Sequence, residues 1–161
     1  AVLMGRQGDE EITARDVDQI FPVMALLEGR AAYEATERAG PADIAALELL
    51  HQRLREHAGA GRITEYYEAN YAIHEAFITL ADNRWLAQVI GDLRKILRLA
   101  RHQTLHVPGR LQQSLAEHLQ VFAALKSGDA GAAEQAMRQH LLAQREALRE
   151  LARNPPSRIA P

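Results

Sequence analysis

The chain has 161 residues, of which 47% are hydrophobic and 25% are charged, and its formal net charge is −2. This length suffices for one domain with its own core, and the near-neutral charge indicates neither a nucleic-acid nor a membrane surface. Cysteine is absent, which excludes disulfides and thiolate metal sites and fits a cytoplasmic protein. No apolar run approaches the roughly 20 residues that cross a bilayer, and no signal peptide is recognisable, so we expect no membrane partner.

Strong helix formers dominate the sequence, and the alternating β-branched runs that indicate strands are missing. We therefore predict an all-α fold, an antiparallel bundle of six to seven helices joined by short links. Residues 1–13 are expected to be a linker stub, in which residues 10–12 are irregular. Residues 14–153 are expected to form the helical domain, and the proline-rich residues 154–161 a disordered tail.

The first predicted helix begins at Thr13 and Asp16, whose spacing is typical of a capping box. Pro22 interrupts its pattern and fits best in the first turn of a second helix, which is expected to end near Arg38. Five further helices are predicted, over residues 41–58, 64–81, 84–102, 109–126 and 130–153.

Apolar side chains recur every three or four residues along these helices, which predicts the stripes that face the core. In the helix over residues 64–81, the predicted stripe includes Tyr66, Ile73 and Phe77. In the helix over residues 84–102, it includes Val89 and Leu97.

Three histidines lie on the apolar stripes of three separate predicted helices: His74, His118 and His140. Asn70 precedes His74 by four residues, so the two side chains share one face of a helix. Neutral imidazoles are ligands for zinc, nickel, copper or iron, and three of them with one amide oxygen leave coordination positions open. One interpretation is therefore a divalent metal ion bound by these four residues.

The other interpretation is that these are core histidines whose ring nitrogens bond to backbone carbonyls or carboxylates. Both interpretations satisfy the requirement that a buried imidazole has polar partners, and the sequence leaves both open. Of the remaining histidines, His51 and His57 are expected at the surface of a charged helix. His102 and His106 lie at a predicted helix end, where they could flank a cavity.

Several short motifs follow one another in a distinctive order. They are Leu26-Leu27-Glu28, Asn70-x-x-x-His74-x-x-Phe77, Ala81-Asp82-Asn83, Arg98 with Arg101, Pro108-Gly109-Arg110, Ser114-x-x-Glu117-His118, Gly128-Asp129 and His140-Leu141. In this order and spacing, residues 14–150 resemble the FCD domain, the C-terminal effector domain of FadR-type regulators in the GntR superfamily.

The resemblance implies a helical bundle that encloses a small-molecule pocket and often holds a divalent metal. Matched by position, the ligands are Asn70, His74, His118 and His140, and zinc or nickel is the expected ion. The family often has aspartate where this chain has Asn70, so the site carries one negative charge fewer.

The family also often has arginine where this chain has Met24. The arginines left to bind a carboxylate effector are Arg101, which shares a helix face with Leu97, and Arg98. A guanidinium binds a carboxylate through two parallel hydrogen bonds, which favours a small organic acid as the effector.

The resemblance further implies a homodimeric sensor of a transcriptional regulator. DNA would be bound through an N-terminal winged helix-turn-helix, for which residues 1–13 are too few. Two other functions stay open: a metal-dependent enzyme of the hydrolase type, and a helical dimerisation module without a ligand. The hydrolase needs a general base, and Glu75 and Glu117, each next to a histidine in sequence, point about 100° away from it on a helix.

Overall fold

The computed structural model describes residues 3–7 and 10–155, with side chains placed from Ile12 onward. Within these residues the chain forms six helices, which confirms the predicted all-α bundle. The helices are α1 (Ala14–Arg38), α2 (Pro41–Gly59), α3 (Ile63–Ala81), α4 (Arg84–Thr104), α5 (Arg110–Lys126) and α6 (Ala130–Arg153).

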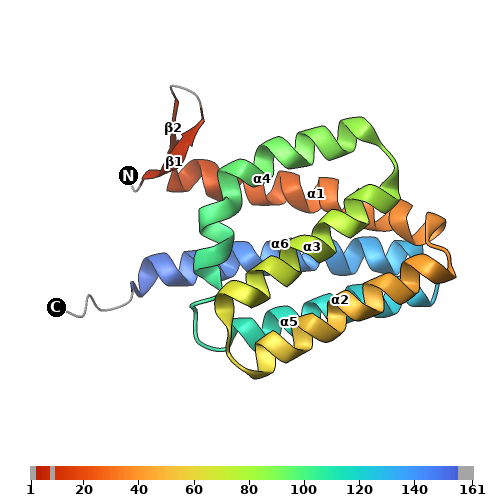
Figure 1. Ribbon diagram of the computed structural model, residues 1–161. Coiled ribbons are helices and arrows are strands. Elements are labelled where there is room, and N and C mark those ends of the chain that lie inside the picture. The colour runs from red at the N-terminus through yellow and green to blue at the C-terminus, as the bar shows by residue number, and fades with distance from the viewer. Residues whose placement is uncertain (1–2, 8–9, 156–161) are drawn as a thin grey trace.

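Helices α1 and α6 form the centre of the bundle, because they pack against one another more extensively than any other pair of the described helices. Helix α3 packs on α1, α2 on α3, and α5 on α6. Figure 1 shows that α4 turns partway along its length, so that its second half descends toward α6, which it contacts. As a result, side chains from α1, α3, α4, α5 and α6 can meet in one interior.

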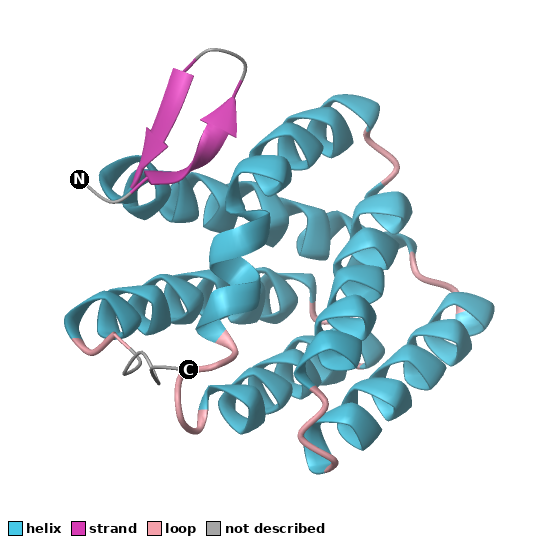
Figure 2. Ribbon diagram, turned by 60° about the vertical axis from the view of Figure 1, so that its left-hand side comes forward, coloured by secondary structure: helices cyan, strands magenta, loops and turns pink. Residues whose placement is uncertain are grey.

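A two-stranded antiparallel hairpin of β1 (Leu3–Gln7) and β2 (Glu10–Thr13) precedes the bundle. Figure 2 shows it projecting beside the start of α1. The expectation that residues 10–12 are irregular was therefore wrong. These strands are short and polar, so they lack the alternating pattern of a strand buried on one face. The Gly-Asp dipeptide between the two runs, typical of hairpin connections, is the signal that could have found them.

The function of residues 1–13 as a linker stays a prediction. At the other end, α6 ends at Arg153, and Asn154 and Pro155 are exposed. The remainder of the predicted disordered tail lies outside the described residues.

The predicted capping box is present at the start of α1, where the amide of Asp16 donates to Thr13 Oγ1 and the amide of Thr13 donates to Asp16 Oδ2. The predicted break at Pro22 is absent, because α1 continues through it. A proline inside a helix costs about 3 kcal/mol. Val17 and Phe21 before it and Met24 after it are completely buried, and each such side chain contributes about 1.5–3 kcal/mol. Packing therefore outweighs the lost hydrogen bond.

The inward stripe predicted for α3 is confirmed, since Tyr66, Ile73 and Phe77 are buried. In α4, Leu97 is buried as predicted, but Val89 is 46% exposed and the adjacent Ile90 is buried instead. Within the described residues, none of the helices combines the length and the apolar composition that a bilayer crossing requires.

Candidate metal centre

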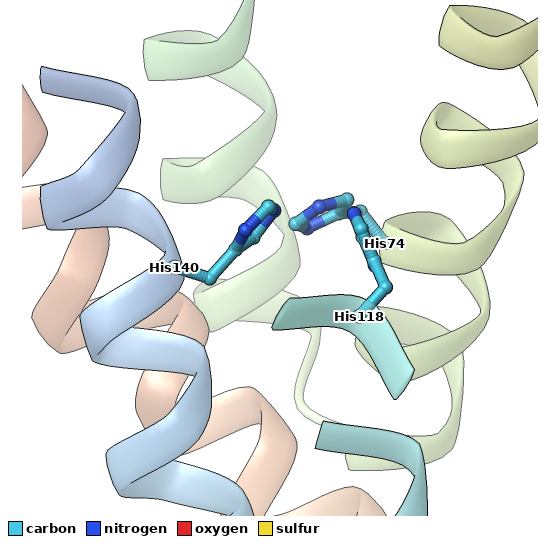
Figure 3. A group of neighbouring side chains, drawn as sticks. All are labelled: His74, His118 and His140. Atoms are coloured by element: carbon cyan, nitrogen blue, oxygen red, sulfur yellow. The ribbon is translucent and has the colours of Figure 1, made fainter. Parts of the chain in front are cut away.

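The three histidines of the predicted metal site come together in the interior of the bundle. Figure 3 shows His74 from α3, His118 from α5 and His140 from α6 with their rings converging. One ring nitrogen from each lies within 4.8 Å of those of the other two, so a single ion could be shared among them. All three side chains are at most 1% exposed, which excludes bulk water from the cluster.

His74 and His140 are held by the apolar stripes of their helices. On α3, Ile73 and Phe77 are buried beside His74, and on α6, Met137 and Leu141 are buried beside His140.

A hydrogen bond also ties α3 to α5. Tyr66 Oη donates to Ser114 Oγ over 2.8 Å, one helical turn before His118. The cluster thus sits where the helices are already fixed to one another by packing.

The ring of His74 is oriented by a buried carboxylate from α1. His74 Nδ1 lies 2.7 Å from Glu28 Oε1, and Arg101 Nη1 lies 3.4 Å from Glu28 Oε2. Burial raises the pKa of Glu28, but Arg101 and His74 outweigh it and hold that pKa far below its usual value. Because an ionised carboxylate only accepts hydrogen bonds, Nδ1 of His74 carries the proton and Nε2 presents its lone pair.

The ring of His140 is oriented in the same way by Glu117. His140 Nδ1 lies 2.6 Å from Glu117 Oε1. Arg110 donates two hydrogen bonds of 2.8 Å to the same carboxylate. Burial opposes ionisation of Glu117, but the bonds from His140 and Arg110 prevail and lower its pKa. This arrangement leaves Nε2 of His140 with its lone pair free to accept or to coordinate.

The lone pairs of these two histidines already have donors nearby. Arg101 Nη2 lies 3.3 Å from His74 Nε2, and Gln144 Nε2 lies 3.0 Å from His140 Nε2. The third histidine differs, because His118 Nε2 is buried and has no hydrogen-bond partner. An unsatisfied buried nitrogen is costly, so a partner of another kind would stabilise it.

The protonation state of the cluster suits metal coordination. Burial is the main cause that lowers the pKa of each of the three histidines, and the pKa of His74 falls to about 3. At neutral pH all three rings are therefore neutral, which is the form that binds a metal ion.

The fourth predicted ligand, Asn70, is also buried, and its Oδ1 has no hydrogen-bond partner. It lies one turn before His74 on α3, and both residues line a cavity of about 930 Å³ between α3 and α4. Two unpartnered polar atoms, Asn70 Oδ1 and His118 Nε2, thus belong to the same predicted site. A metal ion bound by both residues would satisfy both atoms.

The two predicted effector-binding arginines line the same cavity, but their surroundings differ. Arg101 is 6% exposed and bonds to Glu28 and His74, whereas Arg98 is exposed. A third arginine, Arg94, also lines the cavity and is paired with Glu75 over 2.7 Å. The structure therefore places one buried guanidinium, that of Arg101, directly at the histidine cluster.

Sequence reasoning missed the residues that hold the cluster in place. Glu28 was recognised only as part of a motif, and Glu117 was rejected as a base although it orients His140. An acidic residue at a position of the apolar stripe was the available signal for Glu28, which follows Met24 by four residues and Ala25 by three. No comparable signal pointed to Gln144.

The expectation that His51 lies at the surface was wrong, since it is 1% exposed. Its Nδ1 bonds to the carbonyl oxygen of Leu47 and its ring stacks on Phe122. The charged residues near it in sequence, Glu48, Arg53 and Arg55, suggested a solvated helix face, but Phe122 of α5 covers that face. His57 is partly buried. His102 lines the cavity as expected, whereas His106 is exposed and is not among the residues that line it.

The sequence matches the FCD domain family over residues 19–143. The chain therefore belongs to this family, whose members are the effector-binding domains of FadR-type transcriptional regulators in the GntR superfamily. No curated protein matches the chain in sequence.

Several solved structures share the fold. McbR/YncC of E. coli is similar with a TM-score of 0.79 and 21% identity, over 88% of this chain and 68% of that one. Lar, which controls the expression of the Listeria monocytogenes agr system and mediates virulence, has a TM-score of 0.72 and 12% identity over 87% and 66%. GntR of Streptococcus agalactiae has a TM-score of 0.69 and 18% identity over 88% and 73%. At such identities the likeness shows the fold alone.

The lowered pKa values of the histidines predict how stability depends on pH. In the presence of a chelator, we expect the free energy of unfolding to fall as the pH drops below about 6.5. The histidines of the unfolded chain become protonated in this range, whereas burial lowers the pKa of the same rings in the folded protein and keeps them neutral. Each histidine contributes up to about 1.4 kcal/mol per pH unit, and its contribution is constant above the unfolded-state pKa. Urea unfolding between about pH 7.5 and about pH 5 measures this slope.

Replacing His118 by leucine should reduce that slope by up to about 1.4 kcal/mol per pH unit, the contribution of one proton. An unchanged slope in His118→Leu would show that other groups cause the pH dependence.

Proposed function

We propose that the chain is the metal-dependent sensor domain of a metabolite-responsive transcriptional regulator. The observation that carries this proposal is the buried cluster of three neutral histidines, whose ring nitrogens lie close enough to share an ion. The FCD family supplies the regulatory context. DNA would be bound by a separate N-terminal domain of the regulator.

The residues present fit a divalent metal, with His74, His118, His140 and Asn70 as ligands. The hydrogen bonds from Nδ1 to Glu28 and Glu117 are those that fix the tautomer and orientation of a metal-binding imidazole. Imidazole nitrogens with one neutral oxygen suit zinc, nickel, copper or iron, and of these zinc or nickel is the ion that we propose. Four protein ligands would fill a tetrahedral zinc site, so an anionic oxygen would bind as a fifth ligand of an ion whose coordination number exceeds four.

The balance of charge favours a small organic acid as the effector. The carboxylate of Glu28, which is buried, and that of Glu117, which is partly buried, are each paired with a buried arginine, Arg101 and Arg110 respectively. The pairs sum to zero and the histidines are neutral, so a divalent ion would bring a charge that nothing nearby compensates. Placing such a charge in an apolar interior is expensive, and an anion that enters from the adjoining cavity offsets it.

The hydrolase alternative has less support. A general base must face the open coordination position, whereas Glu28 and Glu117 face the Nδ1 side of two histidines. Glu75 lines the cavity but is paired with Arg94. The carboxylates near the cluster are thus engaged in positioning rings and neutralising arginines.

We expect the purified chain to bind one equivalent of zinc or nickel. Replacing His118 and His140 together by leucine should abolish this binding, because only one imidazole of the cluster remains. Elemental analysis after dialysis against the metal, with circular dichroism to verify folding, measures both results.

His51→Leu is the matched control, since His51 is equally buried and its ring centre is 6.5 Å from that of His118, yet it is outside the cluster. It should retain the metal. Metal retained by the double variant would place the ion elsewhere, and no metal in the unsubstituted chain would favour a dimerisation module without a ligand.

For the effector, we expect a hydroxy acid or dicarboxylate to bind in the metal-loaded chain, and Arg101→Met to weaken that binding by about 1.5–3 kcal/mol, the range for a hydrogen bond to a charged group. Arg98→Met should cost less than about 1 kcal/mol, because Arg98 is exposed and its charge is screened by water.

Calorimetry with a panel of small acids, with and without metal, makes the measurement. Equal binding to the metal-free chain, or binding confined to uncharged compounds, would contradict this assignment.

A homodimer is the assembly that we propose, because closed two-fold symmetry is the commonest arrangement of regulators that bind paired DNA half-sites. Helices α1 and α4 pack against one another and carry five large apolar side chains that are about half exposed or more. These side chains are Val23, Leu26, Trp85, Val89 and Leu99. Such exposure is typical of a surface that a partner covers.

We expect the chain to have twice its monomer mass of 17.9 kDa in solution. Leu26→Glu and Val89→Glu should each shift it toward the monomer, because they place a charge in the proposed interface. Leu49→Glu is the control, since Leu49 is 57% exposed but lies on α2. Light scattering coupled to size-exclusion chromatography distinguishes these results, and a monomeric unsubstituted chain would exclude the dimer.

A further inference from the structure

One atom of the cluster has two possible uses. Nε2 of His74 presents the only lone pair of that ring, because Nδ1 donates its proton to Glu28. Arg101 Nη2 lies 3.3 Å from His74 Nε2 and donates to this lone pair. A metal ion shared by the three histidines requires the same lone pair, so the hydrogen bond and the coordination bond cannot coexist.

Charge strengthens this incompatibility. Arg101 is 6% exposed and the histidines are at most 1% exposed, so little water lies between them to screen a repulsion. A divalent ion beside His74 would face a guanidinium at close range. It would also attract Glu28, the carboxylate that pairs with Arg101.

We propose that Arg101 is an internal competitor of the metal ion: it occupies the His74 lone pair until the ion binds, and it then turns into the cavity, where it binds the anionic effector. This inference rests on the proposed function of the site as a metal-dependent sensor. Its direction of movement follows from the cavity, which Arg101 and His74 both line.

The competition couples the two ligands. An anion in the cavity stabilises the guanidinium in its displaced position, so it removes part of the cost of binding the metal. By linkage, the metal raises the affinity for the anion by the same factor. Each ligand therefore binds more tightly when the other is present than when it is alone.

The sign of one substitution distinguishes this function from a structural one. If Arg101 merely supports His74 through Glu28, its removal weakens the metal. If Arg101 competes, Arg101→Met binds zinc more tightly than the unsubstituted chain, by about tenfold to a hundredfold, the range expected for a lost hydrogen bond to a charged group. Competition with a chromophoric chelator measures the zinc affinity, with and without acetate as the probe anion.

Acetate should tighten zinc binding to the unsubstituted chain and do so much less in Arg101→Met. Arg94→Met is the matched control, because Arg94 lies on the same helix, is 8% exposed and lines the same cavity, but bonds to Glu75 rather than to a histidine. It should change the zinc affinity by less than about threefold.

Removal of Arg101 leaves Glu28 without its cation, which could prevent folding. The double variant Glu28→Gln/Arg101→Met avoids this charge, and it should bind zinc more tightly than Glu28→Gln alone. A second measurement uses the unsubstituted chain with ¹⁵N-labelled arginine. Zinc should shift the side-chain resonances of Arg101 and leave those of Arg149, which is paired with Asp18 away from the cluster, nearly unchanged.

Tighter zinc binding after removal of Arg101, including the case in which only the variant binds zinc, supports the competition. Zinc bound to the unsubstituted chain with unchanged Arg101 resonances, or bound equally or more weakly by Arg101→Met, overturns it and leaves the metal site intact. Failure of every variant and of the unsubstituted chain to bind zinc overturns both the competition and the proposed function.

Discussion

The requirement that buried imidazoles find polar partners governs the rest of this structure. Three neutral rings lie in the interior of a small bundle, where water does not reach them. Two of the rings are satisfied at Nδ1 by carboxylates from α1 and α5, Glu28 and Glu117. Each carboxylate is in turn neutralised by an arginine, and the residues of this network come from five helices, α1, α3, α4, α5 and α6.

This chain of partners explains why so many charged residues are buried in a domain of this size. Each arginine–carboxylate pair leaves no net charge, and each histidine remains neutral because burial lowers its pKa. The interior is therefore electrically balanced before any ligand enters. A sensor built in this way responds strongly to a charged ligand, because an added charge disturbs the balance and an added counter-charge restores it.

The two interpretations that the sequence left open for the histidines are compatible in the structure. His74 and His140 bond to carboxylates through Nδ1, as core histidines do, and this bonding turns Nε2 toward the centre of the cluster. The hydrogen bonds that satisfy the rings are thus the same ones that prepare them for coordination. Arg101 and Gln144 lie within hydrogen-bond distance of these Nε2 atoms, so a metal ion would have to replace them as the partners of the two rings.

The sequence by itself determined the helical class and the convergence of His74, His118 and His140. Helical periodicity is a local property, and a polar residue on an apolar stripe must point inward. It did not determine that α1 continues through Pro22, that His51 is buried under α5, or that Glu28 and Arg101 meet His74 from two other helices. Only the tertiary structure decided these points, because each depends on contacts between residues that are far apart in the chain, and their spacing along it carries no trace of those contacts.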